Sequence, residues 1–248
     1  MISKICGIMI VILALPCLGL RVELSNDTFA TSGRSANRNL FITNNSEKMI
    51  ALEVYAQSRQ MDSITGVDQL EDVEDFLIYP NQLLLQPDEQ QVVTLTWVGA
   101  QTLSDEKAFR IIVEELNLSL GDDELAEDDM TVKLAALTKV IKAAYVAPDD
   151  AKPNTYVINS DVIEDQNNNK KIQLTFKNSG TAHEILKQTP IKLTPLDDAG
   201  NKLNSKSITY IPEELRGVLN ILAKSQRVIT IDWPDQFSEG VVKVHASL

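Results

Sequence analysis

Along most of the chain, apolar residues recur at every second position in short runs, and Asn, Gly, Pro and Asp separate these runs. Alternation with a period of two is typical of half-buried β-strands, whereas an amphipathic helix repeats its apolar residues every three or four positions. In the first part of the chain the pattern predicts seven strands, at residues 22–29, 39–43, 49–57, 76–79, 90–98, 108–116 and 131–146. Seven short strands with turn signals between them indicate a β-sandwich.

A second set of strands follows a polar segment, residues 147–154, which contains Pro148 and Pro153 and resembles an interdomain linker. These strands are predicted at residues 156–158, 171–178, 191–196, 207–211, 227–233 and 241–246. Only residues 212–222 carry a helical signal, enough for one or two turns. We therefore predict an all-β protein of two β-sandwich domains, at residues 20–148 and 149–248.

Two acidic segments interrupt the alternation. Residues 61–75 are predicted to form a solvated loop between strands. Residues 122–129 contain six carboxylates directly before the seventh strand, and their mutual repulsion favours a flexible backbone. Two interpretations remain for the second segment: an acidic loop that aids solubility, or a flexible segment that leads into a functional strand.

The first residues have the features of a secretory signal peptide. Lys4 provides a positive charge, residues 5–18 are apolar but short for a membrane span, and Cys17 and Gly19 are small residues before a cleavage site. We predict a signal peptide at residues 1–19, while acylation of Cys17 in a lipoprotein is the alternative. Because Cys6 and Cys17 both lie inside this segment, the mature chain is expected to have no thiol and no disulfide.

The net charge argues against some partners. The full chain carries 23 basic and 35 acidic residues, a net charge of −12, and removal of Lys4 with the signal leaves 22 and 35, or −13. An acidic protein repels the phosphates of nucleic acid and the headgroups of anionic lipid. No later segment is long and apolar enough to span a bilayer. We therefore expect no nucleic-acid partner and no membrane insertion after the signal is removed.

Several segments together resemble the PapD-like periplasmic pilus-assembly chaperones. In the first domain the resemblance is carried by ITNNSEK at 42–48, the alternating residues 50–55, FLIYPNQLLLQPDEQQVVTLTW at 76–97, EKAFRIIVEEL at 106–116 and KVIKAAYVAP at 139–148. In the second domain FKNSGTAHEI at 176–185 and residues 221–234 match more loosely. The resemblance implies two immunoglobulin-like domains joined at an angle, with a cleft between them.

The resemblance also implies a function. Such a chaperone acts in the periplasm, stabilises pilus subunits by lending them a β-strand, and delivers them to an outer-membrane usher. Strand addition uses main-chain hydrogen bonds for affinity and alternate side chains for specificity, and chaperone–pilin complementation is a known example. In this chain Met130, Val132, Leu134 and Ala136 share one face of the seventh strand and are the expected donor residues. The alternative is that they belong to an ordinary sandwich core, and Leu137 and Ile141, which break their alternation, indicate a bulge near residues 135–137.

In the best-known branch of the family, two basic residues hold the carboxylate at the C-terminus of the subunit. Lys142 matches the residue of the seventh strand, although it could also be a plain surface lysine. The position on the first strand falls near Asn26, which has no charge, so that Arg34 or Arg38 takes its place or the subunit is anchored differently.

An acid near the domain junction is a further family feature, and Glu106 corresponds to it. The arginine expected as its partner on the seventh strand is replaced near Val146.

Residues for catalysis are scarce. His183 and His245 are the only histidines and have no cysteine nearby, and the Asp165, Asn167, Asn169 series lacks the glycine and the final glutamate of a calcium loop. We expect no enzyme activity, no cofactor and no metal, and we interpret His183 as a surface residue of a turn or strand. The alternative function is a secreted immunoglobulin-like adhesion or structural pilus component.

Overall fold

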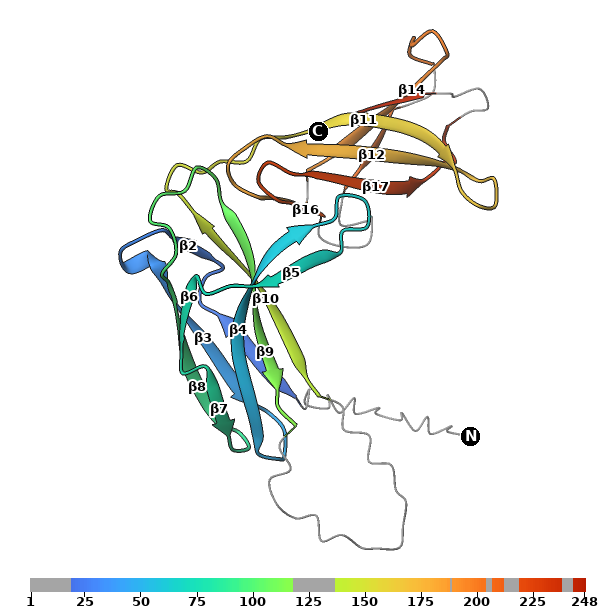
Figure 1. Cartoon of the computed structure of the whole chain (residues 1–248). Coiled ribbons are helices and arrows are strands. Elements are labelled where there is room, and N and C mark those ends of the chain that lie inside the picture. Colours follow the sequence, from blue (N-terminus) through green and yellow to red (C-terminus); the bar gives the residue numbers. More distant parts are fainter. Residues whose placement is uncertain (1–18, 118–136, 188, 204–206, 212–218, 238–242) are drawn as a thin grey trace, which may run out of the picture.

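The computed structural model describes residues 19–117, 137–187, 189–203, 207–211, 219–237 and 243–248. Within these ranges the chain is almost entirely β, with no α-helix and one short 3₁₀-helix, η1 (Arg34–Ala36). Figure 1 shows two β-rich lobes that meet at an angle, the first formed by β1 to β10 and the second by β11 to β18. The predicted fold class, all-β with two sandwich domains joined at an angle, is confirmed.

Two sheets form the first lobe. The four-stranded sheet has the order β1-β3-β8-β6, and the larger sheet has the order β2-β10-β9-β4-β5, with β7 also paired to β4. All these pairs are antiparallel except β2 with β10, which is parallel. The strands are β1 (Leu20–Leu24), β2 (Thr28–Ala30), β3 (Asn37–Asn44), β4 (Ile50–Met61), β5 (Asp68–Asp72), β6 (Phe76–Tyr79), β7 (Gln82–Leu85), β8 (Gln90–Trp97), β9 (Lys107–Glu115) and β10 (Lys139–Ala147).

Smaller sheets form the second lobe, in the orders β11-β12-β17, β13-β16 and β15-β14-β18. Its strands are β11 (Thr155–Glu164), β12 (Lys170–Asn178), β13 (Glu184–Leu186), β14 (Ile191–Leu196), β15 (Ile208–Tyr210), β16 (Leu219–Ile221), β17 (Gln226–Asp232) and β18 (Lys243–Ser247). The predicted linker, 147–154, begins at the last residue of β10 and ends directly before the first residue of β11.

Each lobe has its own hydrophobic core, as the alternation of apolar residues requires. In the first core the ring of Phe76 meets those of Phe29, Trp97 and Phe109 edge to face, at centroid distances of 5.3, 5.4 and 5.1 Å. In the second core β12 contributes alternate residues that are fully buried, Ile172, Leu174 and Phe176. Aromatic rings bury large areas, so this group of four rings contributes much of the first core.

A buried asparagine ends a central strand in each lobe. The amide of Asn44 donates to the carbonyls of Lys48, Leu85 and Gln86. The amide of Asn178 likewise donates to the carbonyls of Ala182 and Ile221. Buried backbone carbonyls need such partners, and the two asparagines lie in the segments 42–48 and 176–185 that carry the sequence resemblance.

Several details differ from the prediction, which did not contain strands β7 and β13. The first predicted strand, 22–29, is divided: β1 joins the four-stranded sheet and β2 joins the larger one, because the chain crosses between the sheets at residues 25–27. The predicted loop 61–75 contains β5, which pairs with the end of β4 and extends it as a hairpin. β11 runs to Glu164, well beyond the predicted 156–158. Residues 219–222, predicted to be helical, include strand β16, which pairs with β13.

Candidate functional site

β10 is the strand on which the sequence placed the binding site, and its two edges differ. On one side residues 139–146 pair with β9 without interruption. On the other side β2 pairs only with Tyr145, Val146 and Ala147. In the described part of the chain, residues 139–144 of β10 therefore have no strand on their second edge. An unpaired edge presents free backbone donors and acceptors to any added strand.

The two faces of β10 follow the alternation of a strand. Val140, Ala144 and Val146 pack toward the first core. Ile141, on the opposite face, is 47% exposed, and Leu137, just before β10, is 51% exposed. Large apolar side chains are thus left in solvent beside the unpaired edge, where an added strand or domain would cover them.

Lys142 is half-buried and lies on the same face of β10 as Ala144 by alternation. It lies opposite Ile111 of β9, three residues before Tyr145, whose amide donates to the carbonyl of Asp27 at the crossover at 2.7 Å. No hydrogen bond or ion pair joins Lys142 to another described residue.

Three residues were considered at the position of the second carboxylate-binding cation, and the structure gives each of them different surroundings. Asn26 accepts a hydrogen bond from the amide of Thr28 through Oδ1 at 2.7 Å, which shapes the crossover. Arg38 directs Nε and Nη2 to the carbonyl of Thr28, at 2.9 and 2.6 Å. Arg34 is exposed on η1. Arg38 thus lies beside Asn26, and both line one pocket of about 460 Å³, but its guanidinium already bonds the backbone.

The four residues proposed as donors, Met130, Val132, Leu134 and Ala136, lie outside the described residues. The structure does not test their role, and it begins to describe the segment again at Leu137.

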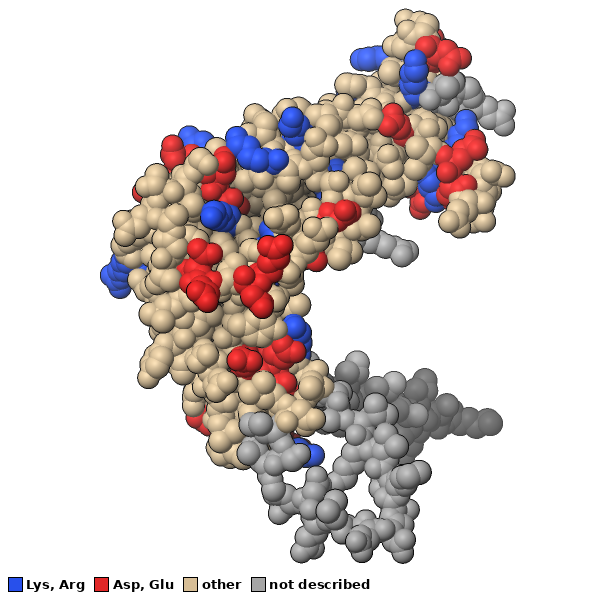
Figure 2. Space-filling model, viewed as in Figure 1, with Lys and Arg blue, Asp and Glu red and all other residues tan. Residues whose placement is uncertain are grey.

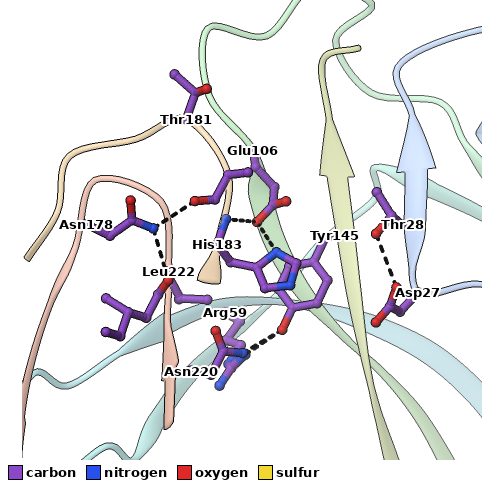
Figure 3. Close-up of polar contacts among 12 residues, drawn as sticks. Asp27, Thr28, Arg59, Glu106, Tyr145, Asn178, Thr181, His183, Asn220 and Leu222 are labelled. Carbon is purple, nitrogen blue, oxygen red and sulfur yellow. Dashed lines mark hydrogen bonds and ion pairs between the residues drawn. The ribbon is translucent and has the colours of Figure 1, made fainter. Parts of the chain in front are cut away.

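A polar cluster joins the two lobes at the upper end of β10, and Figure 3 shows it. Glu106 Oε1 accepts from the amide of His183 at 2.9 Å and lies 2.7 Å from its Nδ1. The amide of Glu106 donates to the carbonyl of Thr181 at 2.8 Å. The side chains of Glu106 and His183 are only 3% and 16% exposed, so the interpretation of His183 as a surface residue is wrong. The acid expected at the junction finds its partner in the second domain and not on the seventh strand.

Tyr145 is the centre of this junction. Its ring stacks on the imidazole of His183, with centroids 3.6 Å apart and planes 9° apart, and the residue is 1% exposed. Its hydroxyl accepts hydrogen bonds from Asn220 Nδ2 at 2.7 Å and from Arg59 Nη1 at 3.4 Å. One side chain of β10 is therefore held by β4 of its own lobe and by β16 and residue 183 of the other.

Arg59 extends the cluster to a second ionic group. Its Nε donates to Asp68 Oδ1 at 2.7 Å, and Arg110 donates to Asp68 Oδ2 from Nε at 2.7 Å. Partial burial raises the pKa of the Asp68 carboxyl, but the hydrogen bonds and charges of the two arginines outweigh this effect and hold the pKa below its usual range. Two cations share one carboxylate here, so the cluster keeps a net positive charge on the sheet face next to Ala143, which pairs with Arg110.

Sequence reasoning missed Tyr145, Asn220 and the Arg59–Asp68–Arg110 cluster. Asp68 was assigned to a solvated acidic run, although an arginine inside a strand is a signal that a buried acid must lie nearby. Tyr145 was only one position of the predicted seventh strand, and nothing in a single sequence reveals that its ring contacts a second domain.

The rest of the described surface offers little other chemistry. No group of three or more His, Cys, Asp or Glu within the described ranges could hold a metal ion. None of the helices in the described part of the chain has the length and hydrophobicity to cross a membrane. On the face shown in Figure 2, acidic and basic side chains are interspersed over both lobes, and the molecule is hollowed between them.

Neither a protein-family model nor a curated protein matches the sequence. Solved structures do match the fold. A chain of the CsuC–CsuE chaperone–tip subunit pre-assembly complex, from the archaic Csu pili of Acinetobacter baumannii, is 13% identical, with a TM-score of 0.52 over 91% of this chain and 97% of that chain.

A chain of the complex between the SafA pilin and the SafB chaperone of Salmonella enterica is 12% identical. Its TM-score is 0.50, over 90% of this chain and 87% of that chain. The resemblance that the sequence motifs indicated is thus confirmed in the architecture, and the chain has the two-domain all-β fold of the periplasmic pilus chaperones.

Proposed function

We propose that this protein is a periplasmic chaperone that binds unfinished pilus subunits, donates its seventh strand to them, and delivers them to an outer-membrane usher. The observation that carries the proposal is the edge of β10, where residues 139–144 have no described partner strand opposite β9. The similarity of the fold to chaperone chains in complexes with pilus subunits supports the same function.

The physical need of the client fits this edge. A pilus subunit of this kind is an immunoglobulin-like domain without its last strand, so its core is open and its neighbouring strands are unpaired. A strand added from outside satisfies those backbone groups and fills the open core with alternate side chains. β10 offers backbone groups on its unpaired edge, and the same sheet is fixed on its other side by β9.

The donor residues remain Met130, Val132, Leu134 and Ala136. The exposed Ile141 and Leu137 continue the apolar surface into the described part of the strand, but on the opposite alternation. The two sets share one binding face only if the alternation shifts between residues 134 and 137, as a bulge would cause. Substitutions on one face of the donor segment and on the other should therefore affect subunit binding differently.

Lys142 is proposed as the residue that holds the carboxylate of the subunit. It is half-buried on β10, and no hydrogen bond or ion pair joins it to another described residue. A charge-assisted hydrogen bond at such a place contributes about 1.5 to 3 kcal/mol and fixes the register of the added strand.

The remaining parts of the proposal follow the same function. Residues 1–19 are a signal peptide that takes the chain to the periplasm and is removed there. Residues 20–148 form the chaperone domain and residues 149–248 the second sandwich. The protein acts by binding, without a catalysed reaction, cofactor or metal.

The test is recovery of a subunit from periplasm. We expect the tagged protein to bring with it a β-rich subunit that aggregates when expressed alone. The double variant Val132→Asp with Leu134→Asp should abolish recovery, because two charges would enter an apolar groove without partners. Lys142→Ala should reduce recovery by a smaller amount.

The matched control is Thr131→Asp with Ala135→Asp, which puts the same charges on the other face of the segment. Recovery that survives the first pair and is lost with the control would assign donation to the other face. Recovery unaffected by either pair would reject strand donation by this segment, and melting temperatures of the free variants show whether each still folds.

A further inference from the structure

We infer that Arg227 and the turn of the β4–β5 hairpin form a latch that fixes the angle between the two lobes. The latch is defined here as residues 62–67, the turn of the hairpin, together with Arg227 on β17. In Figure 1 the hairpin leaves the first lobe and reaches toward β17 of the second. It is a second connection between the lobes, on other elements than the junction of Glu106, Tyr145 and His183.

The contact itself is polar and involves the backbone of the turn. Nη1 of Arg227 donates to the carbonyls of Ser63 and Ile64, at 3.1 and 3.0 Å. The amide of the next residue, Val228, donates to the same carbonyl of Ser63 at 2.6 Å. Among the described strands β17 is the outer one of its sheet, so the turn also covers a backbone group on an edge that no described strand pairs with.

The turn is built to present these carbonyls. Asp62 Oδ1 accepts from the amides of Ile64 and Thr65, at 3.0 and 2.7 Å, and from the hydroxyl of Thr65 at 2.8 Å. The amide of Gly66 donates to the carbonyl of Asp62 at 2.9 Å. Because these bonds are made inside the turn, little conformational freedom is lost when the guanidinium binds.

Gly66 is required by the contact as well as by the turn. Its φ of 72° is in the left-handed region. A Cβ at this position would lie 2.0 Å from Nη2 of Arg227, so the guanidinium fits against the turn only because the residue has no side chain.

Apolar burial does not hold the turn in place. Ile64 and Val67, the large apolar residues of the turn, are 70% and 62% exposed. The latch therefore depends on a few hydrogen bonds, most of them from one side chain, and loss of Arg227 should release it.

Two separated contacts have a mechanical consequence that one contact does not have. If the lobes met only at the junction next to the linker, one lobe could still rotate about that junction relative to the other. A second contact, made by the hairpin, prevents this rotation. Arg227 is thus a positioning residue for the hollow between the lobes. Its importance for capture of a subunit rests on the proposed function, but its effect on the angle does not.

The experiment measures the distance between the lobes in the free protein. Spin labels are placed on cysteines introduced at Glu47 and Lys202, which are exposed and lie in different lobes, and both natural cysteines are within the predicted signal peptide. The distance distribution is then recorded by pulsed electron spin resonance. Arg227→Ala and Gly66→Ala should each broaden it, and Gly66→Ala should have no further effect when Arg227 is already alanine.

Two controls match these variants. Gly33→Ala introduces the same substitution at the same φ of 72°, but with nothing within 4 Å of the new Cβ. Lys243→Ala removes a cation that bonds the carbonyl of Asp198 within the second lobe. Both should leave the distribution unchanged.

A distribution that stays narrow in Arg227→Ala, or an equal effect of Gly66→Ala and Gly33→Ala, would overturn the latch. Failure of the wild-type protein to recover a subunit would reject the proposed function and leave this measurement intact.

Discussion

The two halves of β10 belong to one continuous strand and have opposite surroundings. Tyr145 and Val146 in the upper half are 1% and 0% exposed and lie between β9 and β2. The second lobe covers Tyr145 at the junction, and Val146 packs in the first core. In the lower half β9 is the only described partner strand, and Ile141 is 47% exposed. One strand is thus a structural element at one end and an available surface at the other.

The two halves of β10 differ in what covers two parts of the strand: the edge opposite β9 and the face turned away from the first core. β2 reaches only three residues along β10, because the first segment crosses between sheets and β2 is short. The second lobe covers Tyr145 through His183 and Asn220 but leaves Ile141 exposed. On the outer face of this strand, an apolar residue is therefore buried near the junction, as Tyr145 is, and exposed further from it, as Ile141 is.

Among substitutions that test this difference between the two halves of β10, Tyr145→Ala should change the stability of the protein most. It removes a buried ring that stacks on His183 and leaves Arg59 and Asn220 without their acceptor, so the free energy of unfolding should fall by about 3 to 5 kcal/mol. Chemical denaturation of the isolated protein measures this. Tyr145→Phe, which removes only the hydroxyl, should cost less. Tyr156→Ala, at an exposed tyrosine, is the control, and an equally small loss from Tyr145→Ala would show that the junction contributes little.

Asp68 lies next to the junction, and Asp68→Asn should reduce the free energy of unfolding by less than Tyr145→Ala does. Arg59, with 4% of its side chain exposed, would lose its charged partner, and we expect a loss of about 1.5 to 3 kcal/mol at neutral pH. The pKa of Asp68 is lowered in the folded state, so its contribution is present above the ordinary carboxyl pKa of about 3.9 and disappears as the pH falls through the lowered value.

Denaturation at several pH values tests this second prediction. The difference between the wild-type protein and Asp68→Asn should be constant near neutral pH and should shrink below about pH 4. A difference that does not change with acidification would mean that the carboxylate charge is not what stabilises the cluster.

The sequence predicts the strands of this protein well, because a strand with one buried face must alternate. β6 and β14 coincide with their predicted bounds, and the central strands β3, β8, β9 and β12 are matched within one or two residues. The errors fall where alternation carries no information. β5 is made largely of charged and polar residues, and its pairing with β4 depends on the hairpin and on the arginines that meet Asp68.

The site is less predictable for a different reason. Glu106 was recognised as a junction residue, but its partner is separated by 77 positions in the chain, and only the packing of the two lobes selects His183. Tyr145 and Ile141 both look like strand residues with one buried face. Which of them is covered depends on β2 and the second lobe, and neither local pattern nor composition describes that arrangement.

Ile141→Asp should have the smallest effect on the stability of the free protein and the clearest effect on binding of the subunit. The side chain is half in solvent, so the charge stays hydrated in the free protein, and the loss of a β-branched residue from a strand costs about 1 kcal/mol or less. Ile111→Asp, at a fully buried position of the paired strand β9, should by contrast prevent folding. If β10 receives a subunit on its unpaired edge, Ile141→Asp should fold and yet recover less subunit from periplasm. Melting temperature and subunit recovery are therefore measured on the same preparations. A marked fall in the melting temperature would place Ile141 in the core of the free protein, and full recovery of subunit would show that this half of β10 is not covered by the client.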